Sequence, residues 1–432
     1  MANRGAADRM DAMSGTDLTA AQLKTMTCAE LRKLADESGL DLPPGLSSED
    51  LVFEILKARI GASAPGYAQG VLEVLPDGFG FLRSPARDYR PGSDDVYVSP
   101  SQIRRLNLKP GHVLSGPMRA PAHGEKYLAL SHVDLVNGAS AEDLRKRTPF
   151  SDLAAGMPRR RLRLAGPWID ARIVGCIAPW GLGQRVLIEA PPRSGRTLLL
   201  SDLAEALELG QPEVYQIVCL IDERPEDAAE MRARLGGSRQ REVVATTFDE
   251  PPARHLALSD MVLARAMRMV EAGENVILVL DSLTDLVRAC AIEQAPSGRV
   301  LAPGLDAGSF VRAKRLFAAA RQIEGGGSLT VVATVSTGTD SPVERAIAEE
   351  FERRCGSQIV LDRSLAEQRI LPAIDVLASG TRREECLLSG AEIEELRMLR
   401  QELEPLSPAE RIERLRERLR GDAGATPADQ ER

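Results

Sequence analysis

One stretch of the chain carries the groups that bind the phosphates of a nucleotide. Ala190-Pro191-Pro192-Arg193-Ser194-Gly195-Arg196-Thr197 stands between an apolar, strand-like run and a helical stretch. A phosphate loop needs a glycine for close approach of the backbone, N–H groups at a helix start, a cation, and a hydroxyl for Mg²⁺. Gly195 and Thr197 meet two of these needs. Ala190, however, replaces the usual first glycine, and Arg196 replaces the usual lysine. The segment predicts a phosphate loop, with a strand-to-helix turn that happens to contain Gly and Thr as the alternative.

Two carboxylate-bearing segments follow at the ends of apolar runs. Asp222-Glu223-Arg224 follows one such run, and Asp281-Ser282 follows another. Because parallel strands open onto a ligand crevice at these ends, Glu223 could polarise an attacking water and Asp281 could organise Mg²⁺. Each aspartate could instead cap the helix that comes next. The two carboxylates together with the loop favour a site for a magnesium-bound nucleotide.

These segments belong to the longest region of the chain. From about residue 166, continuous apolar runs such as residues 217–221, 276–280 and 329–334 alternate with helical stretches. Runs of this kind are typical of buried parallel strands. The pattern predicts an α/β domain over residues 166–390, followed over residues 391–432 by C-terminal helices and a polar tail.

Shorter regions precede the α/β domain. Residues 1–17 are small and polar, which predicts a disordered tail, and the helical spacing over residues 18–62 predicts a small helical bundle. Over residues 67–137, short strand-like runs alternate with turns such as Pro76-Asp77-Gly78, the rhythm of a small closed antiparallel barrel. Residues 138–165 are then a connector.

Composition limits the class of protein. The 432 residues are 43% hydrophobic and 27% charged, as in soluble globular proteins, and no apolar run approaches the ~18 residues of a membrane span. We expect a cytoplasmic protein without a membrane partner, because no apolar signal-peptide core follows the first residues. The net charge of −8 excludes a uniformly basic surface but not a local cleft for nucleic acid. Six cysteines without a Cys-x-x-Cys pair and four histidines argue against disulfide or zinc sites.

Five strings of the sequence are long and specific: residues 77–83, 95–105, 220–226, 247–251 and 379–382. They resemble the family of bacterial transcription termination factor Rho, and the resemblance runs from about residue 20 to about residue 400. The resemblance implies an OB-fold barrel after the helical bundle and a RecA-like P-loop ATPase domain. It implies a homohexameric RNA translocase or helicase that uses ATP and Mg²⁺, binds pyrimidine-rich single-stranded RNA and acts on the RNA polymerase elongation complex to terminate transcription. The strings are Asp77-Gly78-Phe79-Gly80-Phe81-Leu82-Arg83, Asp95-Val96-Tyr97-Val98-Ser99-Pro100-Ser101-Gln102-Ile103-Arg104-Arg105, Leu220-Ile221-Asp222-Glu223-Arg224-Pro225-Glu226, Thr247-Phe248-Asp249-Glu250-Pro251 and Ser379-Gly380-Thr381-Arg382.

The resemblance assigns the primary RNA site to the barrel. Aromatic faces on barrel strands can stack bases, and a nearby arginine can contact phosphate or a base edge. Phe79 and Phe81, two residues apart, could instead fill the core, but the flanking Gly78 and Gly80 favour a stacking platform. The positions that match the family's RNA-binding residues are Phe79, Phe81, Arg83, Asp95, Tyr97, Glu125 and Tyr127.

The resemblance also assigns the nucleotide site. Glu223 matches the catalytic carboxylate, and Asp281 and Thr197 match the residues on the magnesium side. Arg363 and Arg382 match arginines that reach the phosphates of a neighbouring subunit, where such a residue is worth about 10³–10⁵ in rate; without the match, both would be surface charges. The positions that match ATP contacts are Gly181, Leu182, Gly183, Gln184, Arg185, Val186, Arg193, Ser194, Gly195, Arg196, Thr197, Leu198 and Arg224.

In the family, a second RNA site lines the central channel of the ring. One channel loop matches residues 295–301, where Arg299 replaces the usual lysine, and the other lies around residues 337–352. In the second loop the channel-facing lysine matches Pro342, and a basic position matches Glu352. Losing two cations and gaining a carboxylate weakens a channel that grips phosphates.

The arginine at position 196 is compatible with two different functions of the protein. A guanidinium is larger and planar, so it does not simply replace a lysine at a phosphate. The retained acidic and arginine positions, Glu223, Asp281, Arg363 and Arg382, favour a working RNA-dependent ATPase. Arg196 and Pro342 favour a paralogue with impaired ATPase activity that acts as an RNA-binding or hexamer-modulating regulator. A relative of the rotary ATPase subunits is a third interpretation, but the base-stacking barrel argues against it.

Overall fold

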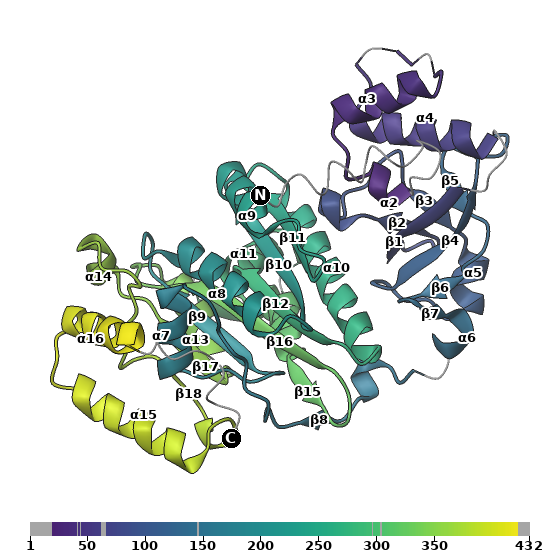
Figure 1. Ribbon diagram of the computed structural model, residues 1–432. Helices are drawn as coiled ribbons and strands as arrows, with labels where there is room; N and C mark the ends of the chain where they lie inside the picture. The colour runs from purple at the N-terminus through teal and green to yellow at the C-terminus, as the bar shows by residue number, and fades with distance from the viewer. Residues whose placement is uncertain are drawn as a thin grey trace. The chain divides into compact units, whose positions relative to one another are not determined.

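The computed structural model describes residues 20–421, apart from residues 41, 44, 62–65, 145–146, 296 and 303–304. The chain divides into two compact units, Met1–Thr148 and Pro149–Arg432 (Figure 1). The tail predicted over residues 1–17 and Pro296 of the predicted channel loop lie outside the described residues. No helix in the described part of the chain combines the length and hydropathy that a membrane-spanning segment requires.

The first unit begins with the predicted helices. Thr27 caps the second of them, α3, reciprocally with Glu30, so that two of the N–H groups at this end are satisfied. Buried side chains of the helices, such as Leu31 and Ile55, share one core with barrel residues such as Leu72. The bounds of the helices are α2 Ala20–Leu23, α3 Cys28–Glu37, α4 Ser48–Gly61, α5 Pro100–Arg105 and α6 Ala141–Leu144, with the 3₁₀ turn η1 Pro85–Arg87.

Seven strands complete this unit. Their order is β1-β2-β3-β5-β4-β6-β7, and pairing of β1 with β4 closes the sheet on itself. Gly80 lies so close to β1 that a Cβ atom would stand 2.4 Å from the carbonyl oxygen of Glu73, so only glycine fits there. The bounds are β1 Gly66–Val74, β2 Gly80–Arg83, β3 Val96–Val98, β4 Val113–Arg119, β5 Leu128–Leu130, β6 Leu135–Val136 and β7 Ala139–Ser140.

The second unit is built on a sheet whose main order is β11-β10-β12-β16-β9-β17-β18. Strands β9, β10, β11, β12, β16 and β17 run parallel, so their carboxyl ends meet at one edge, and β18 is antiparallel. The bounds are β8 Ala155–Gly156, β9 Arg185–Ala190, β10 Tyr215–Glu223, β11 Arg241–Thr247, β12 Asn275–Asp281, β13 Val300–Ala302, β14 Leu305–Asp306, β15 Arg321–Ile323, β16 Ser328–Ser336, β17 Ser357–Val360 and β18 Gly380–Thr381.

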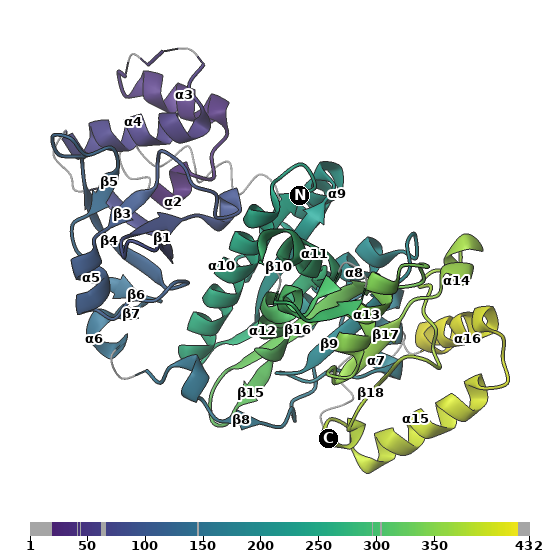
Figure 2. The same ribbon diagram turned by 180° about the vertical axis from the view of Figure 1, so that it is seen from behind.

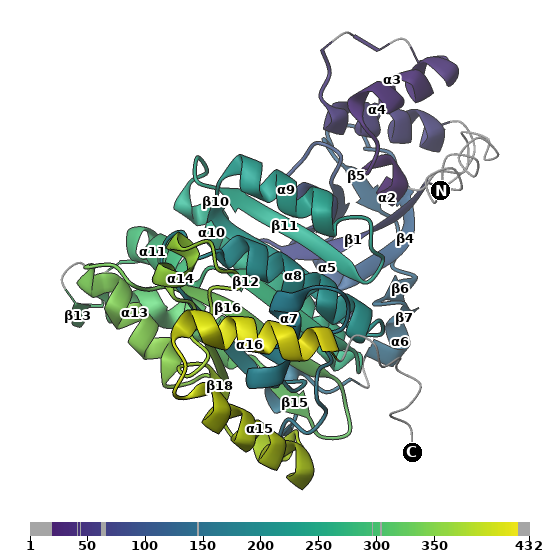
Figure 3. The same ribbon diagram turned by 60° about the vertical axis from the view of Figure 1, so that its left-hand side comes forward.

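Helices cover both faces of this sheet. Helices α7, α8, α9 and α16 lie on one face of the sheet (Figure 3), whereas α10, α11 and α13 pack on the other face (Figure 2). The first four helices share one buried cluster with strand residues such as Ile188 and Val218. The bounds are α7 Ile169–Ile177, α8 Arg196–Gly210, α9 Pro225–Leu235, α10 Pro252–Glu271, α11 Leu283–Glu293, α12 Val311–Ala318, α13 Pro342–Glu352, α14 Arg363–Glu367, α15 Gly390–Leu403 and α16 Pro408–Gly421, with 3₁₀ turns η2 Phe150–Asp152, η3 Ala307–Phe310 and η4 Glu384–Cys386. The predicted sequence of helical bundle, barrel and α/β domain is confirmed.

Candidate nucleotide and RNA sites

The predicted phosphate loop joins β9 to α8. Ala190 ends the strand and Arg196 is the first residue of the helix, so the free N–H groups of the helix start face the loop. Gly195 has φ 87° and Arg193 has φ 64°, and these two left-handed residues curl the backbone. Leu371 lies close to Gly195: a Cβ atom added to this glycine would stand 3.3 Å from Cδ2 of Leu371. The loop therefore has the backbone form that an anion requires.

Arg196 pairs with both of the predicted carboxylates. Its Nη2 lies 2.6 Å from Oε1 of Glu223, and its Nε lies 3.1 Å from Oδ1 of Asp281. The side chain of Asp281 is 1% exposed, that of Glu223 is 11% exposed and that of Arg196 is 24% exposed. Since Glu223 ends β10 and Asp281 ends the neighbouring β12, one guanidinium joins the carboxyl ends of two adjacent strands.

Burial raises the pKa values of both carboxylates. It raises the pKa of Glu223 to about 7, and the nearby Asp281 adds to the rise while Arg196 opposes it. Burial also raises the pKa of Asp281, against the effect of Arg196 and of the Thr334 hydroxyl. Thr334 Oγ1 donates a hydrogen bond of 2.6 Å to Asp281. A pKa near neutrality is suited to a group that exchanges protons with water.

The other predicted loop residues differ in exposure. Ser194 is buried, and its hydroxyl donates to the carbonyl of Pro191 at 2.7 Å, so it stabilises the turn. Arg193 is exposed, Thr197 is half-buried, and Leu198 is 43% exposed. The predicted magnesium ligand Thr197 stands next to Arg196 in the first turn of α8.

The segment from Gly181 to Val186 lies at the other end of β9. This strand of six residues spans roughly 17 Å and separates the segment from the loop. Gly183 (φ 85°) has no room for a side chain, since a Cβ would lie 2.2 Å from Gln322 N. Within one chain, the structure does not bring residues 181–186 and 193–198 to the same phosphate, and their joint contact with ATP stays a prediction.

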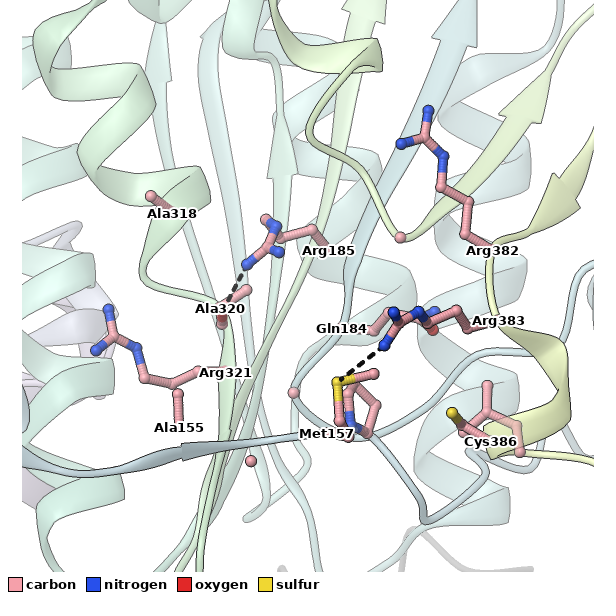
Figure 4. A pocket seen from close by; sticks show the side chains of 15 residues that line it. Ala155, Met157, Gln184, Arg185, Ala318, Ala320, Arg321, Arg382, Arg383 and Cys386 are labelled. Atoms are coloured by element: carbon pink, nitrogen blue, oxygen red, sulfur yellow. Dashed lines mark hydrogen bonds between the residues drawn. The ribbon is translucent and has the colours of Figure 1, made fainter.

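A cavity of about 530 Å³ opens beside this second segment (Figure 4). Arginines dominate its polar lining, and η4 contributes Cys386 to the wall. Arg185 donates to the carbonyls of Arg354 at 2.9 Å and Ala320 at 3.0 Å. The four arginines that line the cavity are Arg185, Arg321, Arg382 and Arg383. An anion is the natural ligand of such a wall.

The two predicted arginine fingers lie at opposite ends of the sheet. The backbone of Arg382 bonds to Gly356 just before β17, next to Arg185, and its side chain lines the cavity. Arg363 follows the carboxyl end of β17, begins α14 and is paired with Glu367 at 2.8 Å on the surface. The structure therefore does not join Arg363 and Arg382 into one site.

Sequence reasoning named Asp222 beside Glu223 but missed the two partners of Asp222, His255 and Thr246. Asp222 adopts φ 62° at an irregularity of β10 and lies 3.5 Å from Nε2 of His255. His255 Nδ1 lies 2.7 Å from Thr246 Oγ1. The predicted ATP contact Arg224 is exposed at the N-cap of α9. A lone histidine on a helix carried no signal, but the Asp222–Glu223 pair could have prompted a search for its partner.

Four aromatic rings of the predicted RNA site gather on the barrel. The centroids of Phe79 and Phe81 are 5.8 Å apart, and Phe79 lies 5.7 Å from Tyr97. Phe81 lies 6.0 Å from Tyr97 and 4.9 Å from Tyr127. Phe81 is buried, Phe79 and Tyr97 are half-buried, and Tyr127 is exposed. Phe81 therefore belongs to the core and contacts the other three rings, and the stacking of bases on these rings stays a prediction.

The charged residues assigned to this RNA site are paired. Arg83 is buried, contacts Glu73 at 2.6 Å and pairs with Asp95, and its guanidinium stands 5.0 Å from the ring of Phe81. Burial raises the pKa of Asp95, although Arg83 opposes it. Glu125 pairs with Arg119 at 2.8 Å, and this contact lowers the pKa of Glu125 to about 2. Arg83 therefore fixes the platform rather than offering a free charge.

The two predicted channel segments carry little positive charge. Arg299 is exposed and precedes the hairpin of β13 and β14. Pro342 is exposed in the first turn of α13, and Glu344 in the same turn pairs with Arg288. Glu352 is exposed at the other end of this helix. The contacts of these residues with RNA stay predictions.

Comparisons with known proteins agree with this architecture. A model described as "Rho termination factor, RNA-binding domain" matches residues 68–142, and one described as "ATP synthase alpha/beta family, nucleotide-binding domain" matches residues 170–381. The chain is 45% identical to transcription termination factor Rho of Aquifex aeolicus over 92% of both proteins. It is 43% identical to that of Chromobacterium violaceum over 92% of this chain and 96% of the relative.

Among solved structures, an ATPase from the type III secretion system of pathogenic bacteria aligns with a TM-score of 0.51 and 26% identity. The alignment covers 57% of this chain and 69% of that protein, which supports a RecA-like core. The match of the barrel decides against the rotary ATPase subunits. The chain belongs to the transcription termination factor Rho family, with an RNA-binding domain followed by an ATPase domain.

Proposed function

We propose that the protein is an RNA-dependent ATPase that moves along nascent single-stranded RNA and terminates transcription. The observation that carries this proposal is the meeting of Glu223 and Asp281 at the cation of the phosphate loop. In this role Glu223 takes a proton from the attacking water, for which a pKa of about 7 is well matched. The N–H groups at the start of α8 and the exposed Arg193 hold the phosphates of ATP.

The barrel loads the RNA. Phe79, Tyr97 and Tyr127 offer ring faces on which bases stack, and Phe81 supports them. The other three rings each lie within 6.0 Å of Phe81, so they offer neighbouring faces to the bases of single-stranded RNA, and pyrimidine-rich RNA is the proposed ligand. The protein works in the cytoplasm on the RNA polymerase elongation complex.

A ring of identical subunits completes the ATPase site. The cavity lined by Arg185 and Arg382 lies at the opposite end of β9 from the loop, so one chain cannot use both on one ATP molecule. A head-to-tail ring brings the loop of one subunit to a different surface of the next. The proposed homohexamer therefore places Arg382 of the adjacent subunit near the phosphates, as an arginine finger.

A second candidate is a Rho paralogue with impaired hydrolysis that regulates by binding RNA or joining hexamers. The pairing of Arg196 with Glu223 and Asp281 favours it, because both carboxylates are then engaged. ATP turnover by the purified protein, with and without poly(C), distinguishes the two. RNA-stimulated turnover supports the enzyme. Its absence alongside intact RNA binding would refute the enzyme, and restored turnover in Arg196→Lys would then identify Arg196 as the cause.

A further inference from the structure

Strand β10, which carries Glu223, is irregular just before this residue. Between Leu220 and Glu223 its register with β11 shifts, so that three residue steps of β10 (220 to 223) oppose two steps of β11 (245 to 247). This extra residue is a β-bulge, and bulges beside active sites re-aim a side chain. Asp222 lies in the bulge with φ 62°, a left-handed conformation that few residues other than glycine adopt. Such a residue persists only where the surrounding structure holds it.

Two buried side chains hold Asp222 in this conformation. Its backbone N–H donates to Oγ1 of Thr246 at 3.4 Å. Oδ1 of its carboxylate lies 3.5 Å from Nε2 of His255, and Nδ1 of the same imidazole lies 2.7 Å from the Thr246 hydroxyl oxygen. Thr246 belongs to β11 and His255 to α10, and both are buried. The backbone and the carboxylate of Asp222 are therefore both engaged, from two different elements.

The chemistry of these groups sets the direction of each contact. A carboxylate oxygen opposite Nε2 requires a proton on that nitrogen, which leaves Nδ1 of the neutral imidazole as an acceptor. The Thr246 hydroxyl then donates its proton to Nδ1, and the same oxygen accepts the N–H of Asp222. The three residues, which we call the His255 cluster, thus form a closed set of contacts that depends on the Thr246 hydroxyl.

The bulge is fixed beyond Glu223 as well. The backbone N–H of Phe248 donates to the carbonyl of Glu223 at 3.0 Å. Between this bond and the His255 cluster, the side chain of Glu223 is directed to Arg196, with Oε1 at 2.6 Å from Nη2. Oδ2 of Asp281 is buried and has no hydrogen-bond partner in the described part of the chain, so Asp281 fits the magnesium ion that accompanies ATP. Glu223 is then the carboxylate that serves the attacking water.

We propose that His255, through Thr246 and Asp222, positions the carboxylate of Glu223 for the hydrolysis of ATP. His255 is a positioning residue: it acts on the bulge that precedes Glu223. The proposal rests on the proposed ATPase function. Displacement of a catalytic group by about 1 Å can cost about 10²-fold in rate. Loss of the His255 cluster therefore lowers turnover, whereas binding of the nucleotide to the phosphate loop is unchanged.

ATP turnover with poly(C), together with titration of the fluorescent analogue mant-ATP, tests this in the full-length protein. Thr246→Val keeps nearly the same side-chain shape but removes the hydroxyl. Its kcat falls about 10- to 100-fold, and its dissociation constant for mant-ATP stays within about twofold. Thr246→Ser retains the hydroxyl and the turnover of the unmodified protein.

Ser259→Ala is the matched control. Ser259 is buried on α10, as His255 is, and its hydroxyl donates to the carbonyl of Leu256 at 2.8 Å. This variant loses a buried hydroxyl outside the His255 cluster and keeps its kcat. Unchanged kcat in Thr246→Val, or an equal fall in Ser259→Ala, would overturn the positioning role while leaving the ATPase intact. Absence of turnover by the unmodified protein would instead refute the proposed ATPase, and the positioning role with it.

A measurement that needs no turnover is the ¹⁵N NMR spectrum of the imidazoles. The sequence has four histidines, so the signals are few, and loss of a signal in His255→Gln assigns that of His255. A proton on Nε2 and none on Nδ1 is the expected result. A protonated Nδ1 would contradict the His255 cluster, because the Thr246 hydroxyl could not then donate to it.

Discussion

Replacing Phe79 with alanine isolates the stacking contribution to RNA binding. Phe79 is half-buried and meets Phe81 and Tyr97 at centroid distances of 5.8 and 5.7 Å, so the substitution removes one ring of the platform. Loss of one base–aromatic stack is worth ~1–3 kcal/mol. The dissociation constant for a cytosine-rich oligonucleotide therefore rises about 5- to 150-fold.

The choice of Phe79 keeps folding and binding separate. Phe81 is 8% exposed, and truncation of a buried phenylalanine lowers the free energy of unfolding by about 3–5 kcal/mol. Phe79 lies outside the buried core cluster of this unit, so Phe79→Ala lowers the free energy of unfolding far less. A binding defect in Phe79→Ala then reports on RNA contact rather than on loss of the barrel.

Fluorescence anisotropy of a labelled oligo(C) at one fixed salt concentration measures the effect, with urea unfolding as the check on stability. Phe53→Ala is the matched control, because Phe53 is a half-buried aromatic of the same unit that lies on α4 beside Lys57. Unchanged affinity in Phe79→Ala, or an equal loss in Phe53→Ala, would refute the stacking platform.

Three further substitutions test other parts of the chain. Arg382→Ala lowers RNA-stimulated ATP turnover by about 10³-fold while mant-ATP binding to the distant loop is unchanged, as steady-state kinetics and titration would show. Burial raises the pKa of Asp170 to about 6. The folded state therefore binds a proton more tightly than the unfolded state, and the free energy of unfolding falls by at most about 3 kcal/mol as the pH rises from about 4 to about 6. Asp170→Asn abolishes this slope in urea titrations. Gly183→Ala, whose Cβ would meet Gln322, lowers the urea midpoint more than Gly124→Ala, which has a similar φ of 88° and nothing within 4 Å.

Local patterns in the sequence predicted the elements well because each pattern is a short-range property. Turn residues such as Pro76-Asp77-Gly78 delimited the barrel strands, and apolar runs such as residues 276–280 marked the buried parallel strands. The positions along the chain of the two segments that match ATP contacts do not show that β9 separates them. Residues 181–186 and 193–198 are near neighbours along the chain, but an extended strand holds them at opposite edges of the sheet.

Which side chains form ion pairs at the site depends on the register between neighbouring strands. The sequence alone does not show this register. The ends of β10 and β12 were predicted to carry carboxylates, and both do. That Arg196 reaches both of them depends on how β10 pairs with β12 and on where the loop returns after β9. The same holds for the pairing of Arg83 with Asp95, two residues that the RNA-site prediction treated as separate contacts.

Three places where we predict contact with a polyanion lack a free cation at the residue that the prediction named. Arg196 is committed to Glu223 and Asp281 in the phosphate loop. Arg83 is committed to Asp95 under the aromatic platform. At the predicted channel, Pro342 brings no charge at all. Phosphate attraction by free cations, which dominates most nucleic-acid affinity and weakens with salt, is therefore reduced at Arg83 and at Pro342, whereas the exposed Arg193 remains at the phosphate loop. We therefore expect ring stacking at the barrel, and helix N–H groups with Arg193 at the loop, to be the main sources of affinity in a chain with a net charge of −8.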